Sequence, residues 1–322
     1  MQSLLDRRLL VITGKGGVGK TTIAAAVGLL AAREGRRTVV VEVGEQSRVA
    51  ELFGVTPPGA GEEATLEPGL TSLSLDPDRA LLEWLQALGG RVSGRLLASS
   101  GTFQYFAAAA PGAKEIVSMI KIWQLTRGGR RGRAHDLVVL DAPATGHALG
   151  MLGSPKTFGA IARVGPIVAQ TKEVEALLRD PARTACVAVA LATEMAVTEA
   201  LELQQGLEDK LDRGLDAVVV NALLPRRFSP AEMGQIAALE EGNFARESLA
   251  ASGLSAHEAR AVAGAAARAA RAVHERSRFQ HNQLARLRRR TFEVLGVPFV
   301  WGEGIDLEAV RGIADRLAAK IA

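Results

Sequence analysis

Short apolar runs alternate with longer helical patterns along this chain. Several runs, such as "LVVL" and "AVVV", are apolar throughout, which is typical of parallel strands that helices cover on both faces. Their regular alternation with helical segments indicates βαβ units, so we expect an α/β fold built on a doubly wound parallel sheet. The expected strands are Leu9–Thr13, Thr38–Val43, Leu70–Leu75, Asp136–Leu140, Thr184–Leu191, Asp216–Val220 and Val297–Val300.

Three helical stretches are longer than simple crossovers between strands require. Two of them, residues 77–129 and 155–181, predict a helical subdomain inserted over one edge of the sheet. The third, residues 226–290, is rich in Ala and Arg and contains the capping-box pattern "SAHE" at Ser255–Glu258, which predicts the start of a helix. We expect a helical hairpin in this stretch, within a single domain that spans residues 1–322.

The apolar side chains of the first helical stretch allow two interpretations. They are either ordinary core or the lining of a groove for an apolar client. The residues concerned are Phe103, Phe106, Ile116, Met119, Ile120 and Trp123.

Composition and charge narrow the class of protein. The 322 residues are 48% apolar and 23% charged, the balance of a globular protein with a sizeable core. The formal net charge of +4 is small and spread along the chain, so no nucleic-acid partner is expected. Cys186 is the only cysteine, which excludes an internal disulfide, and no apolar run approaches the ~18 residues that span a bilayer. We therefore expect a cytoplasmic protein.

The strongest chemical signal lies directly after the first expected strand. Gly14–Thr21 reads G-x-x-x-x-G-K-T between "LLVIT" and the helical run "TTIAAAVGLLAA", the context of a phosphate loop. Backbone N–H groups of such a loop surround phosphate oxygens, Lys20 reaches the β- and γ-phosphates, and Thr21 offers a hydroxyl to Mg²⁺. The expected nucleotide contacts are Gly14, Gly16, Gly17, Val18, Gly19, Lys20, Thr21 and Thr22.

A second lysine, Lys15, stands at the start of the loop, where its side chain is poorly placed to reach its own nucleotide. The pattern K-G-G-V-G-K-T-T resembles the deviant Walker A motif of the class that includes MinD, ParA, the nitrogenase iron protein and the ArsA family. Members of that class form face-to-face dimers in which the early lysine contacts the partner subunit's nucleotide. The resemblance implies a homodimer, or a dimer with a paralogous subunit, in which Lys15 stabilises charge on the transferred phosphoryl group.

Further motifs resemble the ArsA family in particular. Asp141 ends the run "DLVVL" and begins "DAPATGH", which is similar to the family's second switch and implies a magnesium-associated carboxylate at Asp141. "LATEMAVTEALEL" and "VVVNALL" are similar to the segments that carry the family's nucleotide-contacting glutamate and adenine-reading asparagine. They imply these roles for Glu194 and Asn221. "VPFVWGEGID" resembles the family's closing loop and places Pro298 and Val300 beside the adenine.

The resemblance covers nearly the whole chain and implies one ATPase unit that uses ATP and Mg²⁺. It implies a switch in which dimer closure is coupled to handling of an apolar protein client or a membrane partner. Two alternatives are a nucleotide-binding regulatory scaffold with little or no hydrolysis and a positioning ATPase like ParA or MinD. The positioning ATPase is the weaker one, because "LEAVRGIADRLAAKIA" at the end of the chain is typical of a sheet-covering helix.

The chain departs from the family pattern in its first switch. The family reads D-P-A-H there, and its aspartate positions the attacking water, but an ungapped count places Gly44 at that position. Glu42 and Glu45 flank Gly44, and either carboxylate could orient the water from hydrogen-bonding distance. We favour Glu45, with Glu42 close behind, and expect slow hydrolysis.

The chain also lacks the cysteines that relatives use to bind zinc and arsenite. No C-x-x-C pair follows Asn221, so no zinc is expected. Arsenite binds thiolates, and Cys186 lies in the middle of an expected strand, which disfavours arsenite as a substrate. Of five methionines only Met119 lies in the first helical stretch, which disfavours a groove for varied transmembrane helices.

Overall fold

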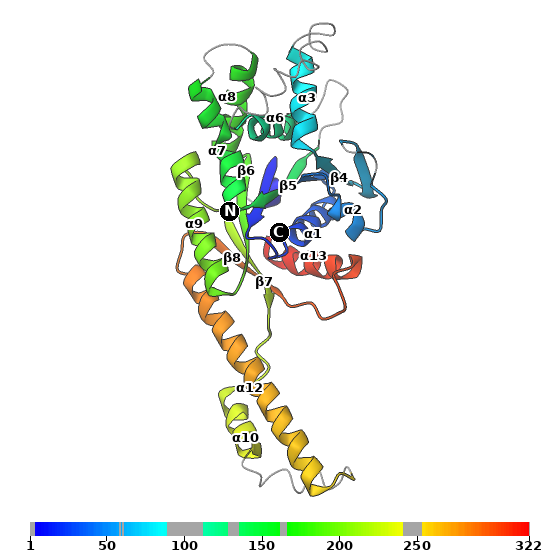
Figure 1. Ribbon diagram of the computed structural model, residues 1–322, viewed down its shortest axis with the longest axis vertical. Helices are drawn as coiled ribbons and strands as arrows, with labels where there is room; N and C mark the ends of the chain where they lie inside the picture. Colours follow the sequence, from blue (N-terminus) through cyan, green and yellow to red (C-terminus); the bar gives the residue numbers. More distant parts are fainter. Residues whose placement is uncertain are drawn as a thin grey trace.

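A computed structural model describes residues 4–57, 59, 61–88, 112–127, 135–161, 166–240 and 253–321. Its centre is an eight-stranded sheet with the order β3-β4-β2-β5-β1-β6-β7-β8, flanked by helices (Figure 1). All neighbouring strands are parallel except β3 and β4. The expected α/β fold with a doubly wound, mostly parallel sheet is confirmed.

The strands lie close to the expected positions, with two differences. They are β1 Leu9–Gly14, β2 Thr38–Val43, β3 Glu63–Glu67, β4 Leu70–Leu75, β5 Leu137–Ala144, β6 Thr184–Leu191, β7 Ala217–Leu223 and β8 Glu293–Pro298. The antiparallel edge strand β3 was not expected, because its sequence "EATLE" is mostly polar. β8 begins at Glu293 rather than at Val297, because this edge strand pairs with β7 through a segment that includes Glu293 and Gly296 and so lacks an apolar run.

The helices connect and cover these strands. They are α1 Lys20–Arg33, α2 Arg48–Leu52, α3 Pro77–Leu88, α6 Ala113–Arg127, α7 Thr145–Ile161, α8 Pro166–Arg179, α9 Glu194–Leu211, α10 Pro230–Glu240, α12 Ala256–Leu287 and α13 Leu307–Ile321, with a 3-10 turn η1 at Leu4–Asp6. None of the described helices is long and apolar enough to cross a membrane.

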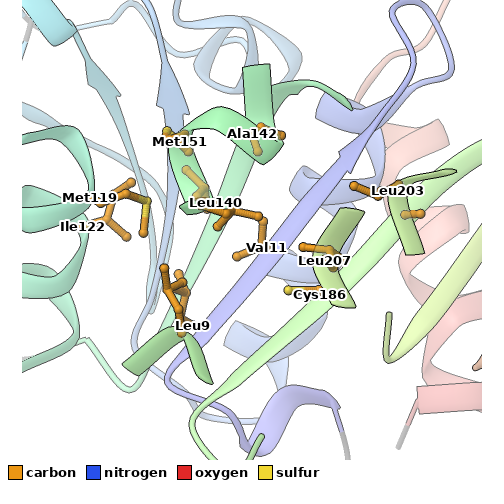
Figure 2. Close-up of a cluster of buried hydrophobic side chains, with 14 of the residues drawn as sticks. Leu9, Val11, Met119, Ile122, Leu140, Ala142, Met151, Cys186, Leu203 and Leu207 are labelled. Atoms are coloured by element: carbon orange, nitrogen blue, oxygen red, sulfur yellow. The ribbon is translucent and has the colours of Figure 1, made fainter. Parts of the chain in front are cut away.

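Each central strand supplies side chains to two cores, because successive residues of a strand point to opposite faces. Leu9 and Val11 of β1 belong to the core beneath α6, α7 and α9, whereas Leu10 and Ile12 belong to the core beneath α1 and α13. Figure 2 shows the first core, in which Cys186 lies among apolar side chains. Burial raises the pKa of this thiol to about 12, so Cys186 is a core residue.

Helices α3, α6 and α8 gather at one end of the molecule (Figure 1). The α6 side chains expected as core or as groove lining are buried in the core of the sheet; they are Ile116, Met119, Ile120 and Trp123. The core interpretation therefore holds for these four residues, while Phe103 and Phe106 lie outside the described residues.

The second helical stretch begins earlier than its sequence indicates. α7 starts at Thr145 and runs through Pro155, the residue at which the sequence predicts the start of this stretch. Proline cannot donate a backbone hydrogen bond to the carbonyl four residues earlier. Here that carbonyl, of Met151, instead accepts a hydrogen bond from the Ser154 hydroxyl at 2.7 Å, so the helix continues past Pro155.

At the opposite end, α10 and α12 pack against each other and extend away from the sheet (Figure 1). The capping box at the start of α12 is present with both of its hydrogen bonds. The Glu258 backbone N–H donates to the Ser255 hydroxyl at 3.3 Å, and the Ser255 backbone N–H donates to the Glu258 carboxylate at 2.8 Å. The expected helix start at this position is confirmed.

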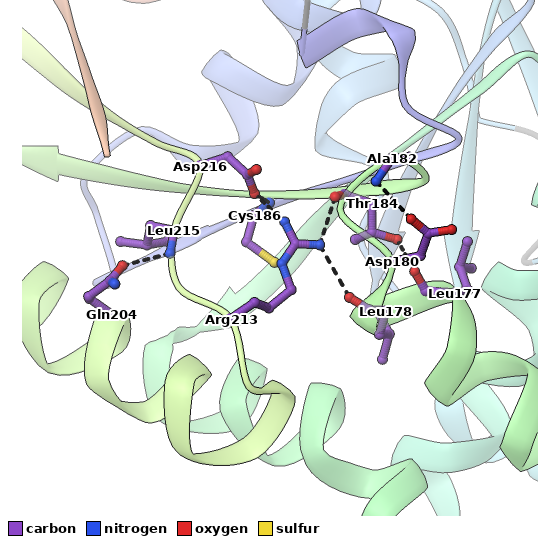
Figure 3. Close-up of polar contacts among 10 residues, drawn as sticks. All are labelled: Leu177, Leu178, Asp180, Ala182, Thr184, Cys186, Gln204, Arg213, Leu215 and Asp216. Carbon is purple, nitrogen blue, oxygen red and sulfur yellow. Dashed lines mark hydrogen bonds and ion pairs between the residues drawn. The ribbon is translucent and has the colours of Figure 1, made fainter. Parts of the chain in front are cut away.

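A polar cluster fixes the far end of α9, the helix that also borders the phosphate loop (Figure 3). Arg213 donates to the carbonyl oxygens of Leu178 and Thr184 at 3.3 and 2.8 Å and to the Asp216 carboxylate at 2.6 Å. Asp216 also accepts from the backbone N–H of Cys186 at 2.7 Å. These bonds join the loop after α9 to β6, so α9 is held in a fixed position against the sheet.

Candidate nucleotide-binding site

The loop between β1 and α1 has a shape that only glycine permits at two positions. A Cβ on Gly14, whose φ is +148°, would lie 2.1 Å from the carbonyl oxygen of Val189 in β6. A Cβ on Gly19, whose φ is +93°, would lie 2.4 Å from Nδ2 of Asn221. The loop therefore curls closely against β6 and the end of β7, and it reaches α1 at Lys20 with its backbone N–H groups at the helix N-terminus.

Lys20 lies at the centre of this loop. Its Nζ donates to the carbonyl oxygen of Lys15 at 3.1 Å, which holds the side chain across the loop. Burial lowers the pKa of Lys20, and the nearby Asp141 carboxylate opposes part of that shift. A partly buried ammonium at this position is suited to bind phosphate oxygens.

Thr21 and Asp141 form a pair that fits a magnesium ion. The Thr21 hydroxyl donates to Oδ2 of Asp141 at 2.6 Å. The other carboxylate oxygen, Oδ1, is buried without a hydrogen-bond partner, and burial raises the pKa of Asp141. An unsatisfied buried carboxylate oxygen beside a hydroxyl supplies the hard oxygen donors that Mg²⁺ prefers, so the residues present fit this ion.

The two glutamates beside Gly44 occupy different environments. Glu42 is only 6% exposed, and its carboxylate accepts the backbone N–H of Val49 at 3.0 Å near the start of α2. Burial raises the pKa of Glu42 to about 7. Glu45 is exposed, and both residues line a cavity of about 480 Å³ together with Lys20 and Asp141. Sequence reasoning missed the fact that Glu42 is drawn inward to bond with the start of α2.

Gly44 itself has a φ of +137°, and no atom lies within 4 Å of the position that a Cβ would take. The site therefore has room for a side chain there, but the backbone conformation favours glycine.

Lys15 points away from the phosphate side of its own loop. Its Nζ forms a 2.6 Å ion pair with the Glu199 carboxylate of α9, and the two side chains are 37% and 29% exposed. Glu199 could not be predicted from local sequence, because it lies 184 positions from Lys15.

Asn221 connects the phosphate loop to the end of β7. Its Nδ2 donates to the carbonyl oxygen of Val18 at 3.0 Å, and its side-chain oxygen accepts the N–H of Ala222 at 2.9 Å. Glu194 is exposed and is the first residue of α9, after Thr193, whose hydroxyl caps the helix. Glu194 thus follows β6, and Asn221 lies near the carboxyl end of the neighbouring strand β7, at the edge where α/β sheets bind ligands.

The closing loop lies at the end of β8. Pro298 and Val300 are half-buried and line a cavity of about 660 Å³ with the exposed Trp301 and the start of α13. The rings of Phe299 and Trp301 pack edge to face, with 4.8 Å between the ring centres. Planar rings at the rim of such a cavity are suited to contact a base.

A larger cavity of about 880 Å³ joins the phosphate loop to this closing loop. Gly19, Lys20 and Thr21 line it, as do Arg48 of α2, Phe53 directly after α2 and Ile305 from the segment before α13. Sequence reasoning did not identify Arg48, although a basic residue at a helix start four positions after Gly44 was a usable signal. In the described parts of the chain, no group of three or more His, Cys, Asp or Glu side chains is arranged to hold a metal ion.

Comparison with known proteins agrees with this geometry. Residues 7–164 match the profile of the ArsA ATPase family, described as anion-transporting ATPases. The chain is 33% identical over 259 residues to the ATPase BagA of Mycobacterium tuberculosis, covering 77% of this chain and 74% of that protein.

Two more distant relatives match shorter parts of the chain. The ATPase GET3 of Paracoccidioides lutzii is 27% identical over 179 residues, which cover 53% of this chain and 50% of that protein. The arsenical pump-driving ATPase of Acidiphilium multivorum is 27% identical over 234 residues, which cover 67% and 39%. The chain therefore belongs to the ArsA family of P-loop ATPases.

Proposed function

We propose that this protein is a homodimeric, ATP-hydrolysing switch whose two subunits close face to face around nucleotide. The observation that carries the proposal is the direction of the two loop lysines. Lys20 lies across its own phosphate loop, whereas Lys15 leaves that loop for the partly exposed Glu199. A lysine placed in this way can serve a second subunit when the two faces meet.

Within one subunit, the phosphate loop binds the phosphates of ATP through its backbone N–H groups and Lys20. Asn221 near the end of β7 and Glu194 after β6 lie at the nucleoside side, and Pro298 and Val300 contact the base. The interaction of Asn221 with Val18 supports this arrangement, because it ties the base side of the site to the phosphate loop.

Thr21 and Asp141 would hold Mg²⁺. The ion neutralises phosphate charge when it is bound. The unpaired Oδ1 of Asp141 and the hydroxyl of Thr21 are the groups of this chain that support such a site.

A carboxylate is needed to orient the attacking water, and those of Glu42 and Glu45 both line the cavity beside Lys20. We assign the orienting role to Glu42 rather than to Glu45. One oxygen of Glu42 is held by the Val49 N–H, and the side chain lines the same cavity as Lys20 and Asp141. Glu45 lines that cavity too, but it is exposed. Glu42 lies in β2, two residues before Gly44, which stands at the usual aspartate position. Its carboxylate would therefore hold the attacking water in a less favourable position, and we expect slow hydrolysis.

Lys15 would complete the partner's site. In the separate subunit the charge of Lys15 is balanced by Glu199, and such a partly exposed ion pair contributes a net stabilisation of only about 0–1 kcal/mol. Exchanging Glu199 for a nucleotide phosphate therefore costs little, and the partner gains a cation against developing charge.

Dimer closure would act on a partner. The name of one relative, the arsenical pump-driving ATPase, describes an ATPase that drives a pump, and this supports a membrane partner or another client for the present chain. The four α6 side chains considered as groove lining are buried, so we place any client surface elsewhere on the helical subdomain or on α10 and α12. If a paralogous subunit takes the place of the second copy, Lys15 of this chain would contact the nucleotide phosphates of that subunit in the same way.

The test is the substitution Lys15→Ala. ATP binding should survive, because Lys15 lies away from its own phosphate site, while turnover and nucleotide-dependent dimerisation should fall. Turnover equal to that of the wild type would refute the cross-subunit role.

One observation favours a second candidate function. Gly44 stands where the family has its water-positioning aspartate, which suits a regulatory scaffold that binds ATP and barely hydrolyses it. Turnover measured with Mg²⁺ and ATP separates the two functions, since a rate equal to the background would support the scaffold.

A further inference from the structure

A second cavity, of about 400 Å³, lies apart from the phosphate loop, between the segment that leaves β7 and the middle of α12. Arg226 and Arg227 line it from the segment after β7, and Arg278 lines it from α12. His274 and His281 of α12 also contribute to the lining. Among the described residues that line this cavity, none carries a carboxylate. The cavity is therefore strongly basic, in a chain whose overall charge is only +4.

The three guanidinium groups are not neutralised within the described residues. None of Arg226, Arg227 and Arg278 forms an ion pair with a carboxylate in this part of the chain. By contrast, Arg213 and Arg311 both do. Glu232, at the start of α10, accepts the N–H of Ser229 in its own helix cap. Arginines that share a cavity without a counter-charge repel one another, and an anion removes that cost.

Hydrogen bonds hold the two walls of the cavity together. The hydroxyl of Ser277, which is buried, bonds to the Pro225 carbonyl at 3.4 Å. Gln280 bridges the same elements, because it accepts the N–H of Leu224 at 2.8 Å and donates to the carbonyl of Ala222 at 3.3 Å. The His281 ring bonds through Nδ1 to the Ser277 carbonyl at 2.7 Å. The cationic side chains therefore project from walls whose backbone is fixed.

We propose that this cavity is a binding site for a phosphate-bearing anion, separate from the nucleotide site. Arg226 and Arg278 bind the phosphate oxygens from opposite walls, because the guanidinium fork matches phosphate geometry. His274 supplies a ring N–H donor, whereas the Nδ1–H of His281 is already used on the Ser277 carbonyl. Phe228 and Pro230 complete the cavity with apolar surface that a ligand's carbon skeleton can contact. The phosphate belongs either to a small phosphorylated molecule or to a lipid headgroup.

The cavity is also linked to the nucleotide side of the protein. Arg227 lines it, and its guanidinium lies over the ring of Trp301 at 5.4 Å from the ring centre. Trp301 in turn lines the cavity at the closing loop. An anion bound in the basic cavity would attract the Arg227 guanidinium and move it away from the Trp301 ring. The loss of this cation–π contact should change Trp301 fluorescence, which therefore reports anion binding.

The experiment measures binding of inorganic pyrophosphate to the full chain by calorimetry, with saturating Mg-ADP present to occupy the phosphate loop. The test variant is Arg226→Ala with Arg278→Ala. The control is Arg260→Ala with Arg268→Ala, which removes the same charge from exposed positions of α12 outside the cavity. Pyrophosphate should bind the wild type and the control equally, and the test variant at least tenfold more weakly.

A second arm separates the two sources of phosphate. Phosphatidylcholine vesicles are prepared with and without phosphatidylglycerol, and co-sedimentation of the three proteins is measured. If a lipid headgroup is the source, only the anionic vesicles recruit the wild type and the control, and the test variant stays in solution. The proposal is overturned if neither probe binds the wild type, or if the control loses binding as strongly as the test variant. Trp301→Phe should abolish the fluorescence change but leave pyrophosphate binding intact.

Discussion

Glu42 offers a quantitative test of the site, because its carboxyl group is buried next to other charges. Its pKa is raised from 4.5 to about 7. The folded protein therefore holds the Glu42 proton more tightly than the unfolded chain does. The contribution of Glu42 to the free energy of unfolding is therefore fully present below pH 4.5 and is lost as the pH rises through about 7. A difference of ~2.5 pKa units corresponds to at most about 3 kcal/mol.

The perturbation is Glu42→Gln, which keeps an oxygen to accept the Val49 N–H but cannot ionise. At pH 4.5 the variant and the wild type should have similar free energies of unfolding. At pH 8 the variant should be more stable by about 2–3 kcal/mol, because only the wild type must bury a carboxylate.

The assay is urea unfolding at a series of pH values, with a chelator present so that no metal binds near Asp141. Glu45→Gln is the matched control, since it removes the same charge from an exposed position of the same segment. Its difference from the wild type should stay within about 0.5 kcal/mol at every pH. Equal pH dependence for the two variants, or a Glu42→Gln protein that is less stable at pH 8, would refute the reasoning.

Three further substitutions test other parts of the site. Asp141→Asn should raise the Mg²⁺ concentration for half-maximal turnover at least about tenfold, measured by phosphate release, while an unchanged value would remove Asp141 from the metal site. Glu199→Gln should increase nucleotide-dependent dimerisation by at most about fivefold in analytical ultracentrifugation, since it frees Lys15 from an exposed pair. A decrease would instead place Glu199 in the interface. Gly14→Ala should lower stability by about 3 kcal/mol or more in thermal unfolding, because the new Cβ would meet the Val189 carbonyl at 2.1 Å; a wild-type melting temperature would contradict the loop geometry.

Much of the fold could be predicted because it depends on local pattern. Fully apolar runs marked the central strands, and the capping box marked the start of α12. The edges were harder, since β3 and β8 are short, partly polar strands defined by their pairing partners. α7 was placed too late because the sequence does not show that the Ser154 hydroxyl occupies the carbonyl that Pro155 leaves free.

The candidate site divides in the same way. The phosphate loop could be proposed from its residue spacing directly after an apolar strand. Asp141 could be proposed from its place at the end of another apolar run and from the likeness of its segment to the family's second switch. The Lys15–Glu199 pair could not, since the folded chain brings together residues that are distant in sequence. The basic cavity was missed for a related reason, because its arginines come from two segments, the residues after β7 and α12, that are about 50 positions apart in the sequence.

Subunit complementation tests the central claim, that each active site is completed by Lys15 of the other subunit, most directly. Lys15→Ala and Asp141→Asn chains are co-expressed with different tags, and mixed dimers are isolated and assayed for ATP turnover. Each variant alone should turn over slowly, whereas the mixed dimer contains one site with Asp141 in its own subunit and Lys15 from the partner. We predict that the mixed dimer recovers a large part of one site's activity. Activity no higher than the mean of the two separate variants, in a mixture shown to be dimeric, would contradict the account.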